Sequence, residues 1–148
     1  MSYHTWSTDG FGFCVDDIKT TPERVLKLAE LNNETLKDLR EYLSETYTDG
    51  YVDEDLTMED FDDFEGNYGE RGLSTILREV INEELSIVWA DDFDGVDFIL
   101  YCPRYPWSLK ETEKNLTKED VENILMKYIK ILTDDPIEID YYSVENGG

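Results

Sequence analysis

The sequence of 148 residues is poor in side chains that bind transition metals. Histidine occurs once, as His4, and cysteine twice, as Cys14 and Cys102. A zinc site needs several such ligands at short spacing, and these three lie far apart, so the sequence argues against zinc. Both cysteines stand among apolar or aromatic residues of predicted strands. We expect them to be buried and reduced rather than joined in a disulfide.

Basic residues are scarce as well. The chain has 13 lysines and arginines against 36 aspartates and glutamates, which gives a formal net charge of −23. Direct binding to nucleic acid is disfavoured, since that task needs positive charge opposite phosphate. No apolar run approaches the roughly 20 residues of a membrane span, and residues 1–9 lack the basic start and apolar stretch of a signal peptide. We therefore expect a cytoplasmic protein.

Motifs for catalysis and for phosphate binding are also lacking. No serine or cysteine nucleophile motif surrounds His4, although nucleophilic catalysis needs a base beside the nucleophile. The run Gly10-Phe11-Gly12 has neither the lysine nor the following helix of a phosphate loop. The sequence therefore predicts no catalytic residues and no cofactor. A small enzyme that uses carboxylates or a divalent ion remains an alternative.

Two acidic loops resemble calcium-binding loops without completing the pattern. Such a loop places acids at alternating positions before an invariant glycine. Ahead of Gly95 the first ligand position holds Ala90, and ahead of Gly66 it holds Phe61. No calcium site is predicted, and weak divalent-ion binding stays open only at Asp91, Asp92 and Asp94.

The residues that are plentiful predict an ordered α/β (α+β) protein of one domain, residues 1–148. Hydrophobic residues make up 40% and aromatic residues 13% of the chain, too much for a disordered chain. We expect a single mixed or mainly antiparallel sheet of four or five strands, covered by three to five helices. Asp9-Gly10 is expected to turn the first two strands into a hairpin. The predicted strands are 3–8, 11–15, 86–90, 96–101 and 137–144.

Start signals and apolar spacing predict the helices. Thr21-Pro22 is expected to begin the first helix, and Asn32-Asn33 to end it and cap a second. Thr57 with Asp60 resembles a capping box and predicts a short helix to about residue 64. Further helices are expected from 72 to about 85 and from Thr117 to about 132.

The acids are distributed unevenly along the chain. Residues 41–70 contain twelve acids and no lysine or arginine, residues 79–103 seven acids and no base, and residues 133–148 five acids and no base. An acidic side and a more mixed side are therefore expected. A solvated face that aids solubility would explain such runs. The interleaved aromatic residues favour an interface instead, since exposed aromatics anchor partners while acids steer a basic one.

We predict that these acids bind a basic protein. Carboxylates spaced like backbone phosphates can occupy a nucleic-acid groove on another protein and meet the arginines and lysines that normally hold phosphate. One candidate set joins the end of the third main helix to the following loop, and comprises Glu79, Glu83, Glu84, Asp91, Asp92 and Asp94. The second and denser set comprises Asp53, Glu54, Asp55, Glu59, Asp60, Asp62 and Asp63.

In size, charge and lack of catalytic motif, the chain resembles small acidic phage or mobile-element proteins of the anti-CRISPR kind that mimic DNA. The resemblance is one of overall character and rests on segments such as DEDLTMEDFDDFEG at 53–66 and DDFDGVDF at 91–98. It implies a partner, such as a nuclease or CRISPR effector, whose nucleic-acid cleft is lined with arginine and lysine. Bacterial immunity proteins, which neutralise basic nuclease toxins, are the alternative. They too would bind a basic protein through acidic residues.

Overall fold

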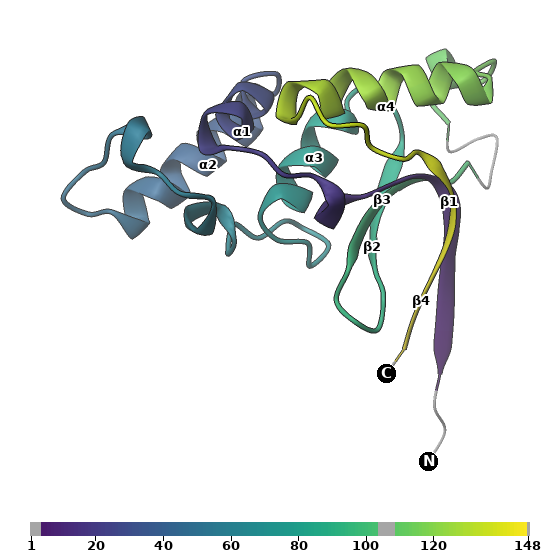
Figure 1. The fold of residues 1–148 in the computed structure, drawn as a ribbon, viewed down its shortest axis with the longest axis horizontal. Coiled ribbons are helices and arrows are strands. Elements are labelled where there is room, and N and C mark those ends of the chain that lie inside the picture. Colours follow the sequence, from purple (N-terminus) through teal and green to yellow (C-terminus); the bar gives the residue numbers. More distant parts are fainter. Residues whose placement is uncertain (1–3, 104–108, 148) are drawn as a thin grey trace.

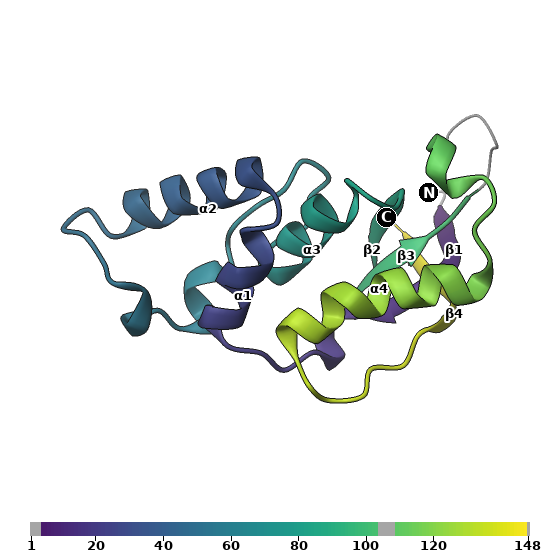
Figure 2. The same cartoon turned by 90° about the horizontal axis from the view of Figure 1, so that it is seen from above.

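The computed structural model of the chain describes residues 4–103 and 109–147 and has an α+β fold (Figure 1, Figure 2). Within these residues, four strands form one antiparallel sheet in the order β2-β3-β1-β4. The strands are β1 Thr5–Cys14, β2 Ile87–Asp91, β3 Asp97–Tyr101 and β4 Asp140–Gly147. The α-helices are α1 Pro22–Ala29, α2 Asn33–Thr46, α3 Leu73–Ile81 and α4 Lys118–Leu132. The predicted fold class is confirmed.

The predicted hairpin at Asp9-Gly10 is wrong, because β1 runs through these residues as one strand. Gly10 pairs with Tyr142 of β4, and its backbone does not take the positive φ that a tight hairpin turn requires. The sheet overrides the local turn preference because β1 is a central strand with partners on both sides. Tyr3, the first residue of the predicted strand, lies outside the described residues.

The predicted helix starts are confirmed by their caps. The side chains of Thr21, Asn32 and Thr117 each accept a backbone N–H of the first turn. The predicted helix at 57–64 is a single 3-10 turn, η3 Met58–Phe61, with the Thr57–Asp60 capping box in place. These caps satisfy N–H groups that a helix cannot pair internally, which is why they mark the boundaries.

Two elements have other bounds than predicted: α3 is shorter, and β4 is shifted three residues towards the C-terminus. Helix α3 ends at Ile81 rather than near 85, because the Asn82 side chain accepts the N–H of Ile87 and the chain turns there into β2. Strand β4 begins at Asp140, which pairs with Gly12 near the end of β1. Ile137 and Ile139 therefore pack against the core ahead of the strand, outside the ladder.

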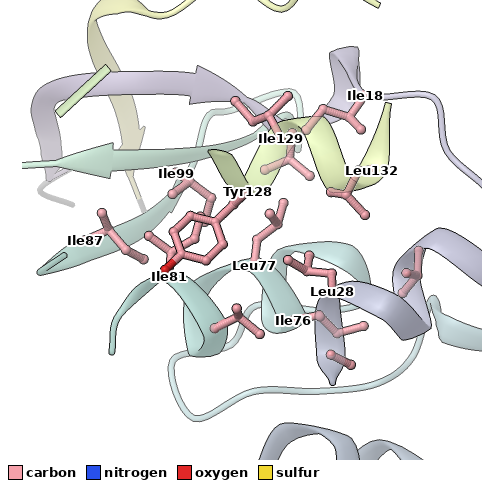
Figure 3. Close-up of a cluster of buried hydrophobic side chains, with 14 of the residues drawn as sticks. Ile18, Leu28, Ile76, Leu77, Ile81, Ile87, Ile99, Tyr128, Ile129 and Leu132 are labelled. Carbon is pink, nitrogen blue, oxygen red and sulfur yellow. The ribbon is translucent and has the colours of Figure 1, made fainter. Parts of the chain in front are cut away.

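The core lies between one face of the sheet and the helices α1, α3 and α4. Alternation along the strands puts Phe11, Phe13 and Ile99 on this face. Figure 3 shows side chains from α3, the sheet and α4 meeting there. The labelled members are Ile18, Leu28, Ile76, Leu77, Ile81, Ile87, Ile99, Tyr128, Ile129 and Leu132.

The other face of the sheet carries a second, smaller apolar cluster, formed by Ala90, Leu100 and Val144. No helix of the described residues covers it in Figure 1. Instead the Asn146 amide, near the end of β4, donates to the backbone carbonyls of Asp91 and Asp92 at the end of β2. These bonds join the two edge strands at that end, so the sheet curls around the cluster.

Candidate interaction surface

The acidic segment, residues 53–63, lies against helix α2 at one end of the molecule (Figure 1). It forms two 3-10 turns, η2 Asp53–Asp55 and η3. Three apolar side chains from this part of the chain, Leu56, Phe61 and Phe64, are buried, and the Phe64 ring stacks on Tyr42 of α2 at 5.6 Å between centroids. Burial of these residues holds the neighbouring carboxylates on the surface.

Some acids of the segment hold its own structure together. Arg40 of α2 donates to both carboxylate oxygens of Asp53, at 2.6 and 3.0 Å. These bonds hold the pKa of Asp53 below its usual value. Asp60 accepts the backbone N–H of Thr57 and the hydroxyl of Tyr47, which likewise lower its pKa. Asp53 and Asp60 are therefore partly engaged within the protein.

The remaining acids of the segment are exposed. Asp63 lies 3.9 Å from Arg71, a weak contact between exposed groups. No ion pair or hydrogen bond to another side chain is found within the described ranges for Glu54, Asp55, Glu59 and Asp62. These four carboxylates are the members of the set available to a partner.

A second row of acids lies on helix α2, the helix against which the segment packs, and was not singled out from the sequence. We call it the α2 stripe: Glu34, Asp38, Glu41 and Glu45, spaced four, three and four residues apart and all exposed. At this spacing four side chains share one helix face. In Figure 2, α2 lies along one side of the molecule, beside α1 and α3 and away from the strands. The signal was present in the sequence as a helical period of acids on a predicted helix.

The other predicted set does not form one surface. The half-buried Glu79 accepts the hydroxyl of Thr35 of α2, and Glu84 is held by Lys127 and Tyr128 of α4. Burial raises the pKa of Glu84, but these two donors outweigh it, so the net pKa is lowered. Asp92 is occupied within its own turn, where it accepts the N–H groups of Asp94 and Val96. Only Glu83 and Asp94 of this set are fully exposed.

The remaining member, Asp91, is tied to the opposite edge of the sheet. Its carboxylate accepts the Asn146 side chain at 3.1 Å, beside the carbonyl bond already described. Burial raises the pKa of its neighbour Asp97, and the charges of Asp16 and Asp91 raise it further, while the Ser74 hydroxyl bound to Asp97 opposes this. Asp91 and Asp97 therefore help to hold the β2–β3 hairpin in its place in the fold.

Lowering the pH from about 7 to about 5 is expected to stabilise the fold. Burial raises the pKa of Glu79, as it does that of Asp97. The folded state therefore binds these protons more tightly than the unfolded state, and stability rises as pH falls through the raised pKa values. Asp53 and Asp60, whose pKa values are lowered, act oppositely below the usual carboxyl range, so stability is lost again there.

Urea unfolding across this pH range checks the prediction. The Glu79→Gln variant keeps the acceptor for Thr35 but has no charge to bury, so it should be more stable than the parent at neutral pH. It should also gain less on acidification. A variant that is less stable at neutral pH, or a parent whose stability does not change between pH 7 and 5, would contradict the assignment.

In the described part of the chain, no group of three or more histidine, cysteine, aspartate or glutamate residues is arranged to hold a metal ion. Cys14 and Cys102 are not joined in a disulfide. Across residues 4–103 and 109–147, no helix has the length and apolar character needed to cross a bilayer. Comparison with protein-family models, with curated proteins and with solved structures found no match.

Proposed function

We propose that this chain is a non-enzymatic interaction protein that binds a basic nucleic-acid-handling protein and blocks its nucleic-acid groove. The observation that carries the proposal is that one end of the molecule presents two exposed acidic features, the α2 stripe and the acidic segment that packs against the same helix. The contacts Arg40–Asp53 and Tyr47–Asp60 fix the acidic segment to α2 and to the residue that caps this helix. A fixed array presents charge without the entropy cost of ordering it on binding.

The spacing of the array suits the groups that hold phosphate. Successive acids of the α2 stripe lie roughly 4.5–6 Å apart along the helix axis, since each residue rises about 1.5 Å. The whole stripe spans roughly 16 Å. Arginine and lysine side chains that line a nucleic-acid cleft can pair with such carboxylates, with two parallel hydrogen bonds where arginine is used. A nuclease or CRISPR effector has such a cleft, and a cytoplasmic phage inhibitor of the anti-CRISPR kind is the role we propose.

The test is capture of the partner from a host lysate on immobilised protein, with washes at about 0.1 M and about 0.5 M salt. We expect a basic nuclease or effector that remains at the lower salt and is released at the higher. Duplex DNA added to the lysate should compete with capture, because both ligands would occupy one cleft. The identity of the captured protein decides between a CRISPR effector and a nuclease toxin, which would indicate an immunity protein.

A matched pair of variants separates the site from net charge. The first replaces Glu54, Asp55, Glu59 and Asp62 by lysine, and spares Asp60 because of its capping role. The second makes the same number of substitutions far from the acidic segment, at Glu122, Asp135, Glu138 and Glu145, which are all exposed. We expect the first to weaken binding of the captured protein at least about 100-fold, a loss of about 2.7 kcal/mol. Equal losses in both variants, or no basic partner at either salt, would overturn the proposal.

A further inference from the structure

Strand β2 is an edge strand, and its outer side is partly occupied: Asn82 binds the N–H of Ile87, and Asn146 binds the carbonyl of Asp91, which leaves the backbone groups of Trp89 between them. In an antiparallel pair, hydrogen-bonded and non-hydrogen-bonded residue pairs alternate. The N–H of Asp92 donates to the carbonyl of Val96 at the hairpin end. Asp92 and Val96 are therefore a hydrogen-bonded pair. The two kinds of pair alternate from there, so Trp89 and its partner Ile99, three pairs further along the ladder, are a non-hydrogen-bonded pair. The N–H and carbonyl of Trp89 therefore point away from β3.

A second bond supports this assignment. The same alternation makes Ile87 a residue whose N–H points outward, and that N–H is indeed bound by the Asn82 side chain at 3.3 Å rather than by β3. Within residues 4–103 and 109–147, neither the N–H nor the carbonyl of Trp89 has a hydrogen-bond partner. An added strand would find both groups in position to exchange hydrogen bonds with one of its residues.

A groove of about 430 Å³, here called the edge groove, lies beside this strand. Its floor is fixed by Arg78, whose guanidinium pairs with the buried Glu70 and lies 4.8 Å from the ring centroid of Tyr68. Its rim is apolar and accessible: Tyr68 is 70% exposed and Val88 40% exposed. The groove is lined by Tyr68, Arg78, Asn82, Ile87, Val88 and Trp89.

Acids flank both ends of the open edge. Glu83 follows Asn82 at the Ile87 end, and Asp92 and Asp94 lie in the turn that ends β2. Two bases of the described residues lie at the groove: Arg78 is neutralised by Glu70 at 2.6 Å, and Lys110 donates to the carbonyl of Asn82. The acids at the two ends of the edge therefore favour a positively charged segment as the strand that binds there. A second copy of this chain is opposed by its own net charge of −23.

We propose that β2 is a docking edge, at which an extended basic segment of the partner adds as a fifth strand. The residue opposite Trp89 exchanges two backbone hydrogen bonds with it and places its side chain in the edge groove. Flanking arginines or lysines face Glu83 at one end and Asp92 and Asp94 at the other. This inference rests on the proposed function for its choice of a basic partner, and it adds a second contact site with backbone recognition.

A blocked peptide of alternating arginine and valine is the probe, and amide hydrogen exchange of the full chain, followed residue by residue by NMR, is the measurement. The N–H of Trp89 should exchange readily in the protein alone and at least about 10-fold more slowly with the peptide. The matched control is the same peptide N-methylated at alternate residues. It keeps the charge but cannot complete a ladder, so it should bind at least about 10-fold more weakly and leave Trp89 unprotected.

Equal binding of the two peptides, protection at other amides only, or no binding of the probe would overturn the docking edge. So would protection of Trp89 that grows with protein concentration without peptide, since that would assign the edge to a second copy. The peptide experiment can fail independently of the capture experiment that tests the acidic segment. The lysine variant at Glu54, Asp55, Glu59 and Asp62 retains β2 and the edge groove, so loss of capture there with Trp89 protection intact would leave both proposals standing.

Discussion

Replacing Arg78 by methionine is expected to lower the free energy of unfolding by about 3–5 kcal/mol. The carboxylate of Glu70 is fully buried, and its Oε1 accepts the Nε–H of Arg78 at 2.6 Å. From the described residues, its other oxygen accepts the N–H of Tyr68, at 3.0 Å. Methionine keeps most of the apolar stem of Arg78 but leaves a buried charge without its counter-ion, which is the costly half of a buried ion pair.

Urea unfolding at neutral pH measures this effect, with Arg71→Met as the matched control. Arg71 is exposed and lies 3.9 Å from Asp63, so its replacement should cost less than about 1 kcal/mol. The double variant Glu70→Leu with Arg78→Met removes both charges and should recover much of the loss. If Arg78→Met proved no more costly than Arg71→Met, the buried Glu70–Arg78 pair would not contribute to the stability of the fold as we expect.

The local parts of the fold could be predicted from the sequence because their causes are local. Caps such as Asn32 and the Thr117–Asp120 box act within one helical turn, and apolar residues at helical spacing mark the buried face of α3 and α4. These signals identified every α-helix of the described residues to within a few positions. The strands were identified by the same kind of local pattern, with β2 and β3 placed almost at their observed bounds.

The turn at Asp9-Gly10 was mispredicted because its outcome depends on distant residues. Locally, aspartate followed by glycine favours a hairpin. In the fold, β3 pairs with one side of β1 and β4 with the other, so the chain gains more hydrogen bonds by staying extended. Partners from residues 97–101 and 140–147 cannot be assigned from the residues around the turn.

The same limit applies to the acidic surface. A sequence shows where acids are dense, but not which of them are occupied by partners far along the chain. Glu84 is bound by Lys127, and Asp91 by Asn146, at separations of 43 and 55 residues. The α2 stripe could have been found, since its spacing is helical. The open edge of β2 and the groove beside it could not, because they depend on strand order.

Strand order also makes Gly12 the position where a single added methyl group should be most damaging. Gly12 is buried between Leu100 of β3 and Asp140 of β4. A Cβ there would lie inside the contact radius of the Ile99 carbonyl oxygen, with the Ile99 carbonyl carbon at 2.9 Å and the Leu100 Cα at 3.0 Å. All three atoms are backbone and cannot rotate aside. Gly12→Ala is therefore expected to cost about 3 kcal/mol, at the upper end for overpacking.

The control is Gly50→Ala, which separates collision from backbone strain. Gly50 has a φ of 93° and no atom within 4 Å of the added Cβ, so alanine there meets only the left-handed penalty of about 1–2 kcal/mol. Urea unfolding of both variants gives the comparison, and hydrogen exchange adds a local test. Because Gly12 holds β3 against β1, its replacement should raise exchange first in the β1–β3 ladder. A Gly12→Ala variant as stable as the parent would show that β1 and β3 do not approach this closely, and would remove the geometric basis for the strand order that makes β2 an edge.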